Sequence, residues 1–280
     1  MTPLTDKEYT YIKNLIYDKS RIDLGDNKRE LVSSRLGKRL RATQKGSYQE
    51  YLKFLQADDS GTELTHLIDA ISTNHTYFFR EYKHFEFLDS SVLPWHSTQV
   101  KKAGKRPFKV WSCASSSGEE PYSLAVHLEE YSQKDKNFCW TIDATDISTN
   151  VLDKARKGIY AEERLKEVRK DQLANFFQKG TGKWTGYYRV KDPLRSKVNF
   201  HHLNLLQSRY PFQKPFDVIF VRNVMIYFDR ETQEQLVNQL HNSLRPGGYL
   251  MIGHSESLTN IRHPFQVVKP AIYRKNETSQ

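Results

Sequence analysis

The stretch that decides the fold is residues 108–125, which read FKVWSCASSSGEEPYSLA. The apolar run 108–113 has the length and composition of a buried strand. Pro121 and the residues after it favour a helix, because proline is common in the first helical turn. A strand, a loop of small residues and a helix in this order predict the first crossover of a nucleotide-binding α/β sheet. Ligands of such sheets bind beyond the carboxyl ends of the strands.

The composition of the loop 114–120 indicates which class of ligand this crossover could bind. It contains one glycine, Gly118, and therefore lacks the three glycines of a dinucleotide site and the Lys-Ser/Thr pair of a phosphate cradle. Glu119 and Glu120 stand where a pyrophosphate would be repelled. A cationic nucleoside such as S-adenosylmethionine fits these charges. The two glutamates also fit a plainer role, since acidic side chains stabilise the N-terminus of a helix.

Another carboxylate, Asp146, ends the next predicted strand, residues 138–146. At that position a carboxylate can accept hydrogen bonds from both hydroxyls of a ribose. An aspartate in a solvated turn is the alternative, and for Asp146 alone it would be favoured. Beside the acidic first loop, we favour the ribose contact.

The remaining pattern predicts two domains. Further short apolar runs occupy residues 198–205, 216–222 and 249–253, with a predicted helix at 231–244, and this alternation indicates a doubly wound, mostly parallel sheet. The first 75 residues show only helical spacing, with capping-box patterns that begin at Thr5 and Ser47. A glycine-rich turn near residues 180–186, between aromatic pairs, predicts an inserted antiparallel hairpin. We therefore predict a helical domain at 1–75, a linker and cleft segment at 76–90, and a sheet domain at 91–280 with an insert at about 171–200.

Charge is concentrated in two places. The chain carries a formal net charge of +10, and residues 28–45 hold seven Lys or Arg against one Glu. The candidate docking residues of that helix are Arg35, Lys38, Arg39 and Arg41. Residues 154–200, around the predicted hairpin, are also strongly basic. Both patches suggest an anionic partner, although a solvated surface is the ordinary fate of Lys and Arg.

Other site classes find little support. Two cysteines and ten histidines show no metal-ligand spacing, so we predict no metal. The sequence shows neither a signal peptide nor an apolar run fit to span a bilayer, and we expect a cytoplasmic protein without membrane insertion.

Five motifs resemble, in the same order, those of the CheR family of chemotaxis-receptor glutamate methyltransferases. They are STNHTYFFRE at 72–81, SSSGEEPYS at 115–123, LNLL at 203–206, RNVMIYF at 222–228 and GHSE at 253–256. The resemblance covers nearly the whole chain. It implies an all-α domain followed by a Rossmann-like methyltransferase sheet with a small inserted β-subdomain. It also implies methyl transfer from S-adenosylmethionine to receptor glutamates in sensory adaptation, with S-adenosylhomocysteine as the product.

The resemblance also implies roles for individual residues. Asn74, Thr76 and Arg80 would contact the cofactor or line its cleft, Glu120 would take the methionine amino end, and Asp146 the ribose. Asn204 and Leu205 would hold the adenine, with Asn223 and Val224 behind the methionine. Asn204 and Asn223 fall at predicted strand ends, where an amide can read an adenine edge or simply form a turn.

The chemistry of the reaction points to Arg80 and Tyr227. A glutamate acceptor has an unperturbed pKa of about 4.3 and is already ionised at neutral pH, so it needs orientation rather than a general base. Arg80 can pair with that carboxylate, and Tyr227 can donate to it or shape its slot. Core packing is the competing role for Tyr227, because bulky residues after a strand usually fill a core.

We expect the partners to be proteins. In the family, the basic helix faces the acidic receptor, and in some members the small β-subdomain grips a tethering peptide. The hairpin near Gly180 resembles that of the tether-binding members. We expect a monomer that binds no nucleic acid, since no base-reading motif follows the fourth strand. A nucleic-acid methyltransferase and a catalytically silent receptor adaptor remain the alternatives.

Overall fold

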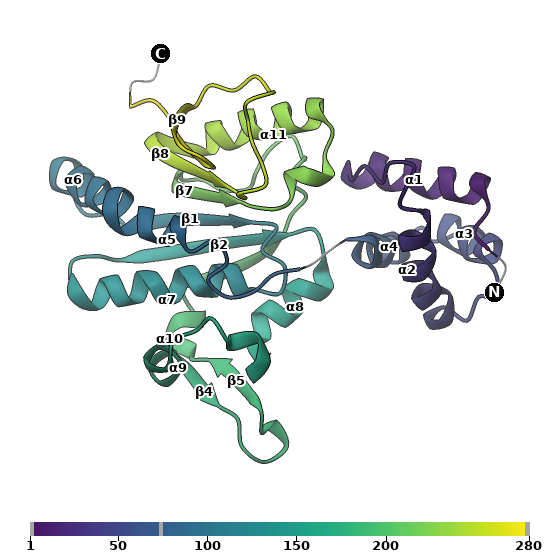
Figure 1. The fold of residues 1–280 in the computed structure, drawn as a ribbon, viewed down its shortest axis with the longest axis horizontal. Coiled ribbons are helices and arrows are strands. Elements are labelled where there is room, and N and C mark those ends of the chain that lie inside the picture. Colours follow the sequence, from purple (N-terminus) through teal and green to yellow (C-terminus); the bar gives the residue numbers. More distant parts are fainter. Residues whose placement is uncertain (1–2, 73–74, 278–280) are drawn as a thin grey trace.

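The N-terminal part of the chain folds into four helices, in a computed structural model that describes residues 3–72 and 75–277. They are α1 (Asp6–Ser20), α2 (Arg29–Ala42), α3 (Tyr48–Gln56) and α4 (Thr62–Ile71), in purple and blue in Figure 1. Both predicted helix caps form, because the side chains of Thr5 and Ser47 accept hydrogen bonds from the backbone N–H groups of Glu8 and Glu50. The predicted all-α domain is confirmed.

Helix α2 buries the face that its spacing predicts. Val32, Leu36 and Leu40 are completely buried in the core of this domain. The basic side chains of the same helix divide into two pairs. Arg35 and Arg39 are half-buried, whereas Lys38 and Arg41 are exposed.

The half-buried pair binds within the domain. Arg39 Nε donates to Glu63 Oε1 at 3.0 Å, and the Tyr51 hydroxyl donates to the same oxygen at 2.7 Å. Arg35 Nη1 donates to the carbonyl oxygen of Ser72, which follows the end of α4, at 2.9 Å. Glu63 is buried, so removal of Arg39 would leave a carboxylate without its counterion. Arg35 and Arg39 therefore stabilise the helical domain, whatever else they contact.

The second domain is built on a seven-stranded sheet in the order β6-β2-β1-β7-β8-β10-β9. Its strands are β1 (Phe108–Cys113), β2 (Trp140–Asp146), β6 (Val198–His202), β7 (Phe216–Val221), β8 (Leu244–Ile252), β9 (Gln266–Lys269) and β10 (Ile272–Arg274). The first five are parallel, and β10 and β9 add an antiparallel edge. The prediction of a doubly wound, mostly parallel sheet is confirmed.

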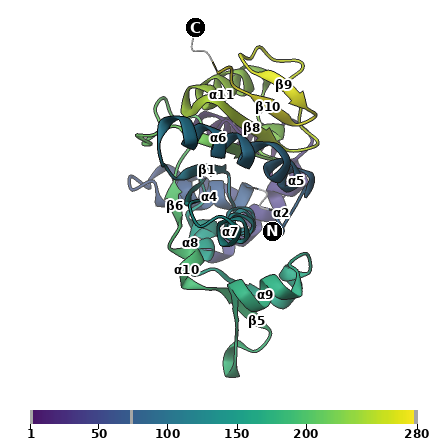
Figure 2. The same cartoon turned by 90° about the vertical axis from the view of Figure 1, so that its left-hand side faces the viewer.

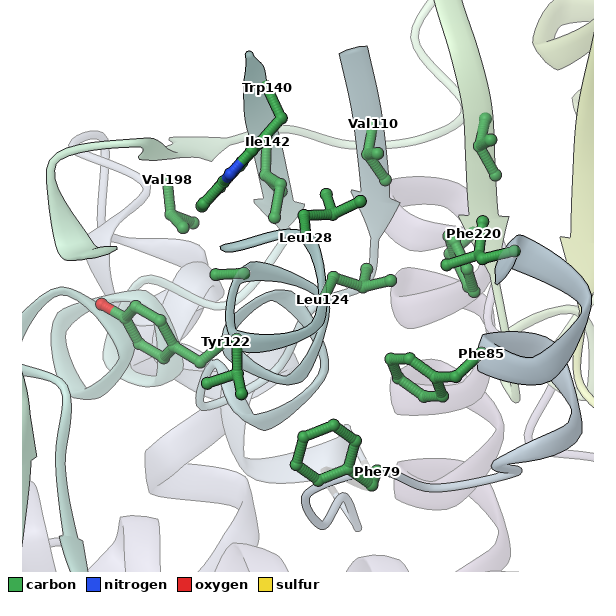
Figure 3. Close-up of a cluster of buried hydrophobic side chains, with 14 of the residues drawn as sticks. Phe79, Phe85, Val110, Tyr122, Leu124, Leu128, Trp140, Ile142, Val198 and Phe220 are labelled. Atoms are coloured by element: carbon green, nitrogen blue, oxygen red, sulfur yellow. The ribbon is translucent and has the colours of Figure 1, made fainter. Parts of the chain in front are cut away.

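Helices cover both faces of this sheet. Neighbouring strand residues alternate between the two faces, so Val110 packs in one core and Trp111 in the other. The first core includes α5 (Lys83–Phe87) and α7 (Glu119–Lys134), whose Leu124 and Leu128 lie against the strands in Figure 3. The second core includes α11 (Arg230–Ser243). Helix α8 (Thr149–Lys157) follows β2 and contacts both β2 and β6.

Some elements differ from the predicted boundaries. Within the predicted linker 76–90, α5 forms and continues through a π-helical turn (Leu88–Val92) into α6 (Leu93–Ala103). Strand β8 begins at Leu244, before the predicted apolar run at 249–253, and its pairing with β7 shifts register. The edge strands β9 and β10 were not predicted. All four residues of β9 are exposed, which removes the alternation that marks a half-buried strand.

The insert is a small three-stranded antiparallel sheet in the order β3-β5-β4. Its elements are β3 (Ile159–Ala161), a 3-10 turn (Glu162–Leu165), α9 (Lys170–Phe176), β4 (Phe177–Lys179), a 3-10 turn (Gly182–Trp184), β5 (Tyr187–Val190) and α10 (Asp192–Arg195). The predicted hairpin is β4 and β5. The sheet begins earlier than the predicted start near residue 171, because β3 pairs with β5.

The insert and the helical domain occupy different sides of the molecule. In both views, the insert lies at the end of the sheet domain opposite α11 and β9 (Figures 1 and 2). The helical domain lies to one side of the sheet in Figure 1. Within the described part of the chain, no helix combines the length and apolar character needed to cross a membrane.

Candidate active site

One cavity lies where the helical domain meets the carboxyl ends of the central strands. Eight of the nine predicted cofactor-binding residues, and Tyr227, line this cavity: Thr76, Arg80, Glu120, Asp146, Asn204, Leu205, Asn223 and Val224. The ninth, Asn74, lies outside the described residues. The helical domain contributes Leu24, Lys28 and Leu31 to the same lining. The cavity therefore belongs to both domains.

The loop after β1 has an unusual backbone. Ala114 and Ser116 have φ values of 51° and 49°, in the left-handed region that is costly for residues other than glycine. The Ser116 N–H donates to Asp146 Oδ2 at 2.8 Å, and the Ser115 N–H donates to the Thr145 carbonyl oxygen at 2.9 Å. The end of β2 thus holds the loop in this shape.

Two hydroxyl groups of this loop are buried without a partner among the described atoms. They are Ser115 Oγ and Ser116 Oγ, and both residues line the cavity. A buried polar group that has no hydrogen bond is costly, so these hydroxyls fit a polar ligand in the cavity.

Asp146 has a strongly perturbed acidity. The side chain is buried, and burial raises the pKa of Asp146 to about 6, although hydrogen bonds from the backbone N–H groups of Ser148 and Ser116 oppose the rise. Its two oxygens hold the loops after β1 and β2 together. A ligand hydroxyl that donates to this carboxylate would favour its ionised form.

The two adjacent glutamates of the loop have separate roles. Glu120 lines the cavity, accepts from Ser112 Oγ at 2.6 Å and accepts from Arg222 Nε at 2.7 Å. Glu119 does not line the cavity and is hydrogen-bonded to Ser117 Oγ and to Arg164. Between the two, Glu120 is therefore the one placed to bind a ligand.

Arg222 was not predicted as a site residue, yet it organises one wall of the cavity. It is buried at the end of β7, where Nη1 donates to the Arg80 carbonyl oxygen at 2.7 Å and Nε binds Glu120. Phe79 and Glu81, on either side of Arg80, have left-handed φ values of 54° and 57°. Arg222 thus supports a strained turn that carries the Arg80 side chain. An ionisable residue directly after a buried strand is the sequence signal for such a role.

Three residues of types that bind metal ions lie close together at this turn. They are Glu81, His84 and His254, and one potential ligand atom of each lies within 4.8 Å of those of the other two. Arg222 Nη1 lies 3.2 Å from His84 Nδ1, and because a guanidinium only donates, His84 must accept there and carry its proton on Nε2. Burial lowers the pKa of His84 to about 3, with a further contribution from Arg222, so the ring stays neutral. This arrangement favours a hydrogen-bond network that holds the turn.

The loop after β7 is held by a second residue that was not assigned a role, Glu256. Its buried carboxylate accepts from the backbone N–H groups of Gly253, Met225 and Asn223 at 2.7, 2.8 and 2.9 Å. Asn223 has a left-handed φ of 58°. A Cβ at Gly253 would lie 2.6 Å from Asn223 Nδ2, so the close approach of the two loops requires glycine there. Glu256 positions Asn223 and Val224 without lining the cavity.

Asn204 and Tyr227 connect the cavity to the helical domain. The Asn204 side chain donates to the Lys19 carbonyl oxygen at 3.1 Å and accepts from the Leu206 N–H at 3.0 Å, so it forms a turn as well as lining the cavity. The Asp23 N–H donates to the Tyr227 carbonyl oxygen at 2.8 Å, and Lys28 Nζ lies 5.6 Å from the centre of the Tyr227 ring.

Taken together, the lining offers partners for a cationic nucleoside. Two carboxylates and two hydroxyls that have no partner among the described atoms face a space that is also lined by Lys28, Arg80 and Arg222, and by the apolar side chains of Ile147, Leu205 and Val224. The carboxylates can pair with a cationic group, and the apolar side chains can cover a base.

Comparisons with known proteins agree with this chemistry. Residues 74–274 match the family described as CheR methyltransferase, SAM binding domain, and residues 7–72 match the family described as CheR methyltransferase, all-alpha domain.

Full-length relatives give the same result. The chain is 40% identical to a chemotaxis protein methyltransferase of Borreliella burgdorferi, over 98% of this chain and 95% of that protein. It is 40% identical to that of Salmonella typhimurium, over 96% and 90%, and 39% identical to that of Escherichia coli, over 96% and 91%.

Proposed function

The chain belongs to the CheR methyltransferase family, and we propose that it transfers methyl groups from S-adenosylmethionine to glutamate side chains of chemoreceptors in the cytoplasm. The products are a glutamate methyl ester and S-adenosylhomocysteine. The observation that carries this proposal is one cavity, lined by both domains, in which Glu120, Asp146, Arg80 and Tyr227 come together. All four lie in one chain, so the proposed site needs no residue from a second copy, and we propose a monomeric enzyme.

The cofactor-binding residues are those of the sheet edge. Asp146 is suited to accept from the ribose hydroxyls, and Glu120 from the methionine ammonium, since a carboxylate that already accepts two hydrogen bonds still has free lone pairs. The hydroxyls of Ser115 and Ser116 are available as further contacts. Leu205 and Val224 offer apolar surface to the adenine and methionine parts.

The residues that act on the acceptor are orienting groups. When bound, S-adenosylmethionine would supply a methyl group on a positively charged sulfur. Transfer would break the bond from sulfur to methyl as a bond from the glutamate oxygen to methyl formed, so no proton would have to move. The protein must keep the carboxylate ionised, align it with the methyl group and exclude water.

Arg80 is suited to hold the acceptor. Its side chain is 23% exposed at the cavity, and Nη1 donates to the His75 carbonyl oxygen at 3.1 Å, which leaves several of its five N–H donors for a substrate. A guanidinium beside a carboxylate keeps that carboxylate ionised and fixes its plane. Tyr227 is far from Arg80 in sequence but lines the same cavity, and it would complete the acceptor slot.

Lys38 and Arg41 are the docking residues that the fold supports best. Both are exposed on α2, and Leu31, near the start of the same helix, lines the cavity. An acidic receptor helix on this surface would lie close to the cavity entrance. Arg35 and Arg39 also belong to the proposed docking helix, but their internal hydrogen bonds make them poor probes of docking, because substituting them would also destabilise the domain.

The insert has a surface that suits a tethering peptide. A groove between α8 and the β4–β5 hairpin is lined by basic side chains, including Arg156, Arg189 and Arg195, and by aromatic ones. Trp184 is 47% exposed and Tyr187 is 42% exposed there. Aromatic rings beside arginines suit a short peptide with acidic and aromatic residues.

We expect receptor fragments incubated with the protein and S-adenosylmethionine labelled in its methyl group to become labelled. Base should release this label, because methyl esters hydrolyse under conditions in which N-methyl groups persist. Base-stable label, or label on nucleic acid, would contradict the proposal. Receptor binding without any cofactor binding would indicate the silent adaptor.

The affinity for S-adenosylmethionine should fall as the pH drops below about 6. Since the folded protein has a raised Asp146 pKa of about 6, the carboxylate that accepts from the ribose is lost below that pH. The dissociation constant should then rise about tenfold per pH unit. Calorimetry between pH 5 and 7.5 measures this, and Asp146→Asn should bind weakly at every pH. A wild-type constant that does not change with pH would refute the assignment.

Arg80→Ala should lower kcat with saturating substrates about a hundredfold, the usual cost of losing a group that orients and stabilises charge. Tyr227→Phe should lower kcat less, about tenfold or below, because the ring and its packing remain. Single-turnover assays measure both effects. If Tyr227→Phe were the more damaging change, the roles of the two residues would have to be exchanged.

The double variant Lys38→Glu/Arg41→Glu should raise the KM for receptor about tenfold and leave the dissociation constant of S-adenosylmethionine within twofold. The matched control is Lys7→Glu/Lys53→Glu, which makes the same change of net charge at exposed residues of α1 and α3. Equal effects of the two double variants would show a general charge effect and rule out docking through α2.

A further inference from the structure

Arg164 connects the insert to two walls of the cavity. It lies in the 3-10 turn Glu162–Leu165, which follows β3, and its side chain is 40% exposed. Nη2 binds Glu119 Oε1 at the end of the loop 114–120 after β1, called the cofactor loop below, and donates to the Thr76 carbonyl oxygen at 2.8 Å. Arg164 itself does not line the cavity, so any effect on the ligand must pass through these two partners.

The first partner, Glu119, is a buried carboxylate whose side chain is 1% exposed. Its second oxygen accepts from Ser117 Oγ at 2.7 Å. Glu119 is the first residue of α7 and precedes Glu120, the carboxylate that lines the cavity. Among the described side chains, Arg164 is therefore the counterion of the buried Glu119 carboxylate at the start of α7.

The second partner, Thr76, belongs to the segment that carries Arg80. Thr76 is buried and lines the cavity. The same segment is joined to Glu119 by another route, since the Phe79 N–H donates to Ser123 Oγ at 2.8 Å and Ser123 Oγ donates to the Glu119 carbonyl oxygen at 2.6 Å. A change at Glu119 would thus reach both the cofactor loop and the turn before Arg80.

A further contact of the insert reinforces this arrangement. The Tyr160 hydroxyl, on β3, donates to the Ser117 carbonyl oxygen at 2.7 Å. Gly118, with a φ of 97°, lies so close that a Cβ there would be 2.8 Å from the same hydroxyl. The base of the insert therefore packs directly on the loop that holds the cofactor.

We propose that Arg164 is a positioning residue for cofactor binding, and that the insert supports the cofactor loop in addition to any partner it binds. This inference rests on the proposed function. Loss of the guanidinium leaves Glu119 buried without its counterion, and such a carboxylate moves toward water or takes up a proton. Either response releases the Ser117–Glu120 end of the loop and the backbone at Thr76.

The chain offers a matched control in Arg169. Its guanidinium also joins the insert to a glutamate of α7, in this case Glu130, and its side chain is 51% exposed. Glu130 lies in the C-terminal part of α7, far along the helix from the cofactor loop. Arg164→Met and Arg169→Met therefore each remove one ion pair between the insert and α7, at opposite ends of that helix.

The experiment measures the dissociation constant of S-adenosylmethionine by calorimetry and the KM and kcat for receptor methylation, with Tm as a measure of folding. Arg164→Met should weaken cofactor binding about tenfold and raise the KM for cofactor, whereas Arg169→Met should stay within twofold of wild type. Glu119→Gln added to Arg164→Met should recover most of the lost affinity, because it removes the unpaired charge.

Three outcomes would overturn the inference. They are equal losses of affinity in the two arginine variants, a lower Tm in Arg164→Met without any change in affinity, and no recovery in the double variant with Glu119→Gln. Failure of the proposed function itself would look different, because the wild-type protein would then bind no S-adenosylmethionine or methylate no receptor.

Discussion

The buried ion pair of Arg222 and Glu120 is the interaction on which the site depends. Arg222 directly follows β7 and Glu120 lies in the first turn of α7, so their contact at 2.7 Å joins the segments that follow two neighbouring parallel strands. Both charges are nearly excluded from water, and each would be expensive alone. Arg222 also holds the Arg80 carbonyl oxygen, and Glu120 faces the cavity, so one pair fixes a candidate cofactor-binding group and the turn of a candidate catalytic residue.

Local patterns made much of this site predictable. The strand, loop and helix at 108–125 are adjacent in sequence, and parallel strands bring Asp146 and Asn223 to the same sheet edge. The residue pattern alone did not separate Glu119 from Glu120, although the resemblance implied Glu120, because the difference depends on Arg164, which lies far along the chain and binds Glu119. The charge of residues 28–45 made Arg35 and Arg39 candidate docking residues, but it did not show that Glu63 and the end of α4 would bind them. The strand β3 is three residues long, too short to show a period.

The helical domain is more than a docking module attached to an enzyme. Leu24, Lys28 and Leu31 line the same cavity as Asp146, and the Asp23 N–H holds the backbone at Tyr227. Asn204 serves both sides, since its amide binds Lys19 while the residue lines the cavity. A receptor docked on the helical domain, as proposed, would therefore contact a domain that itself lines the candidate cofactor cavity.

The left-handed residues around the cavity have a consequence for how this protein can change over time. Phe79, Glu81, Ala114, Ser116 and Asn223 adopt φ values between 49° and 58°, each at a cost of about 1 kcal/mol or more. Glycine would remove that cost at any of the five positions, but it would also widen the range of shapes open to the empty cleft. Substitution by glycine at these positions would therefore replace a backbone that already has the shape of the cleft by one that must be ordered each time a ligand binds.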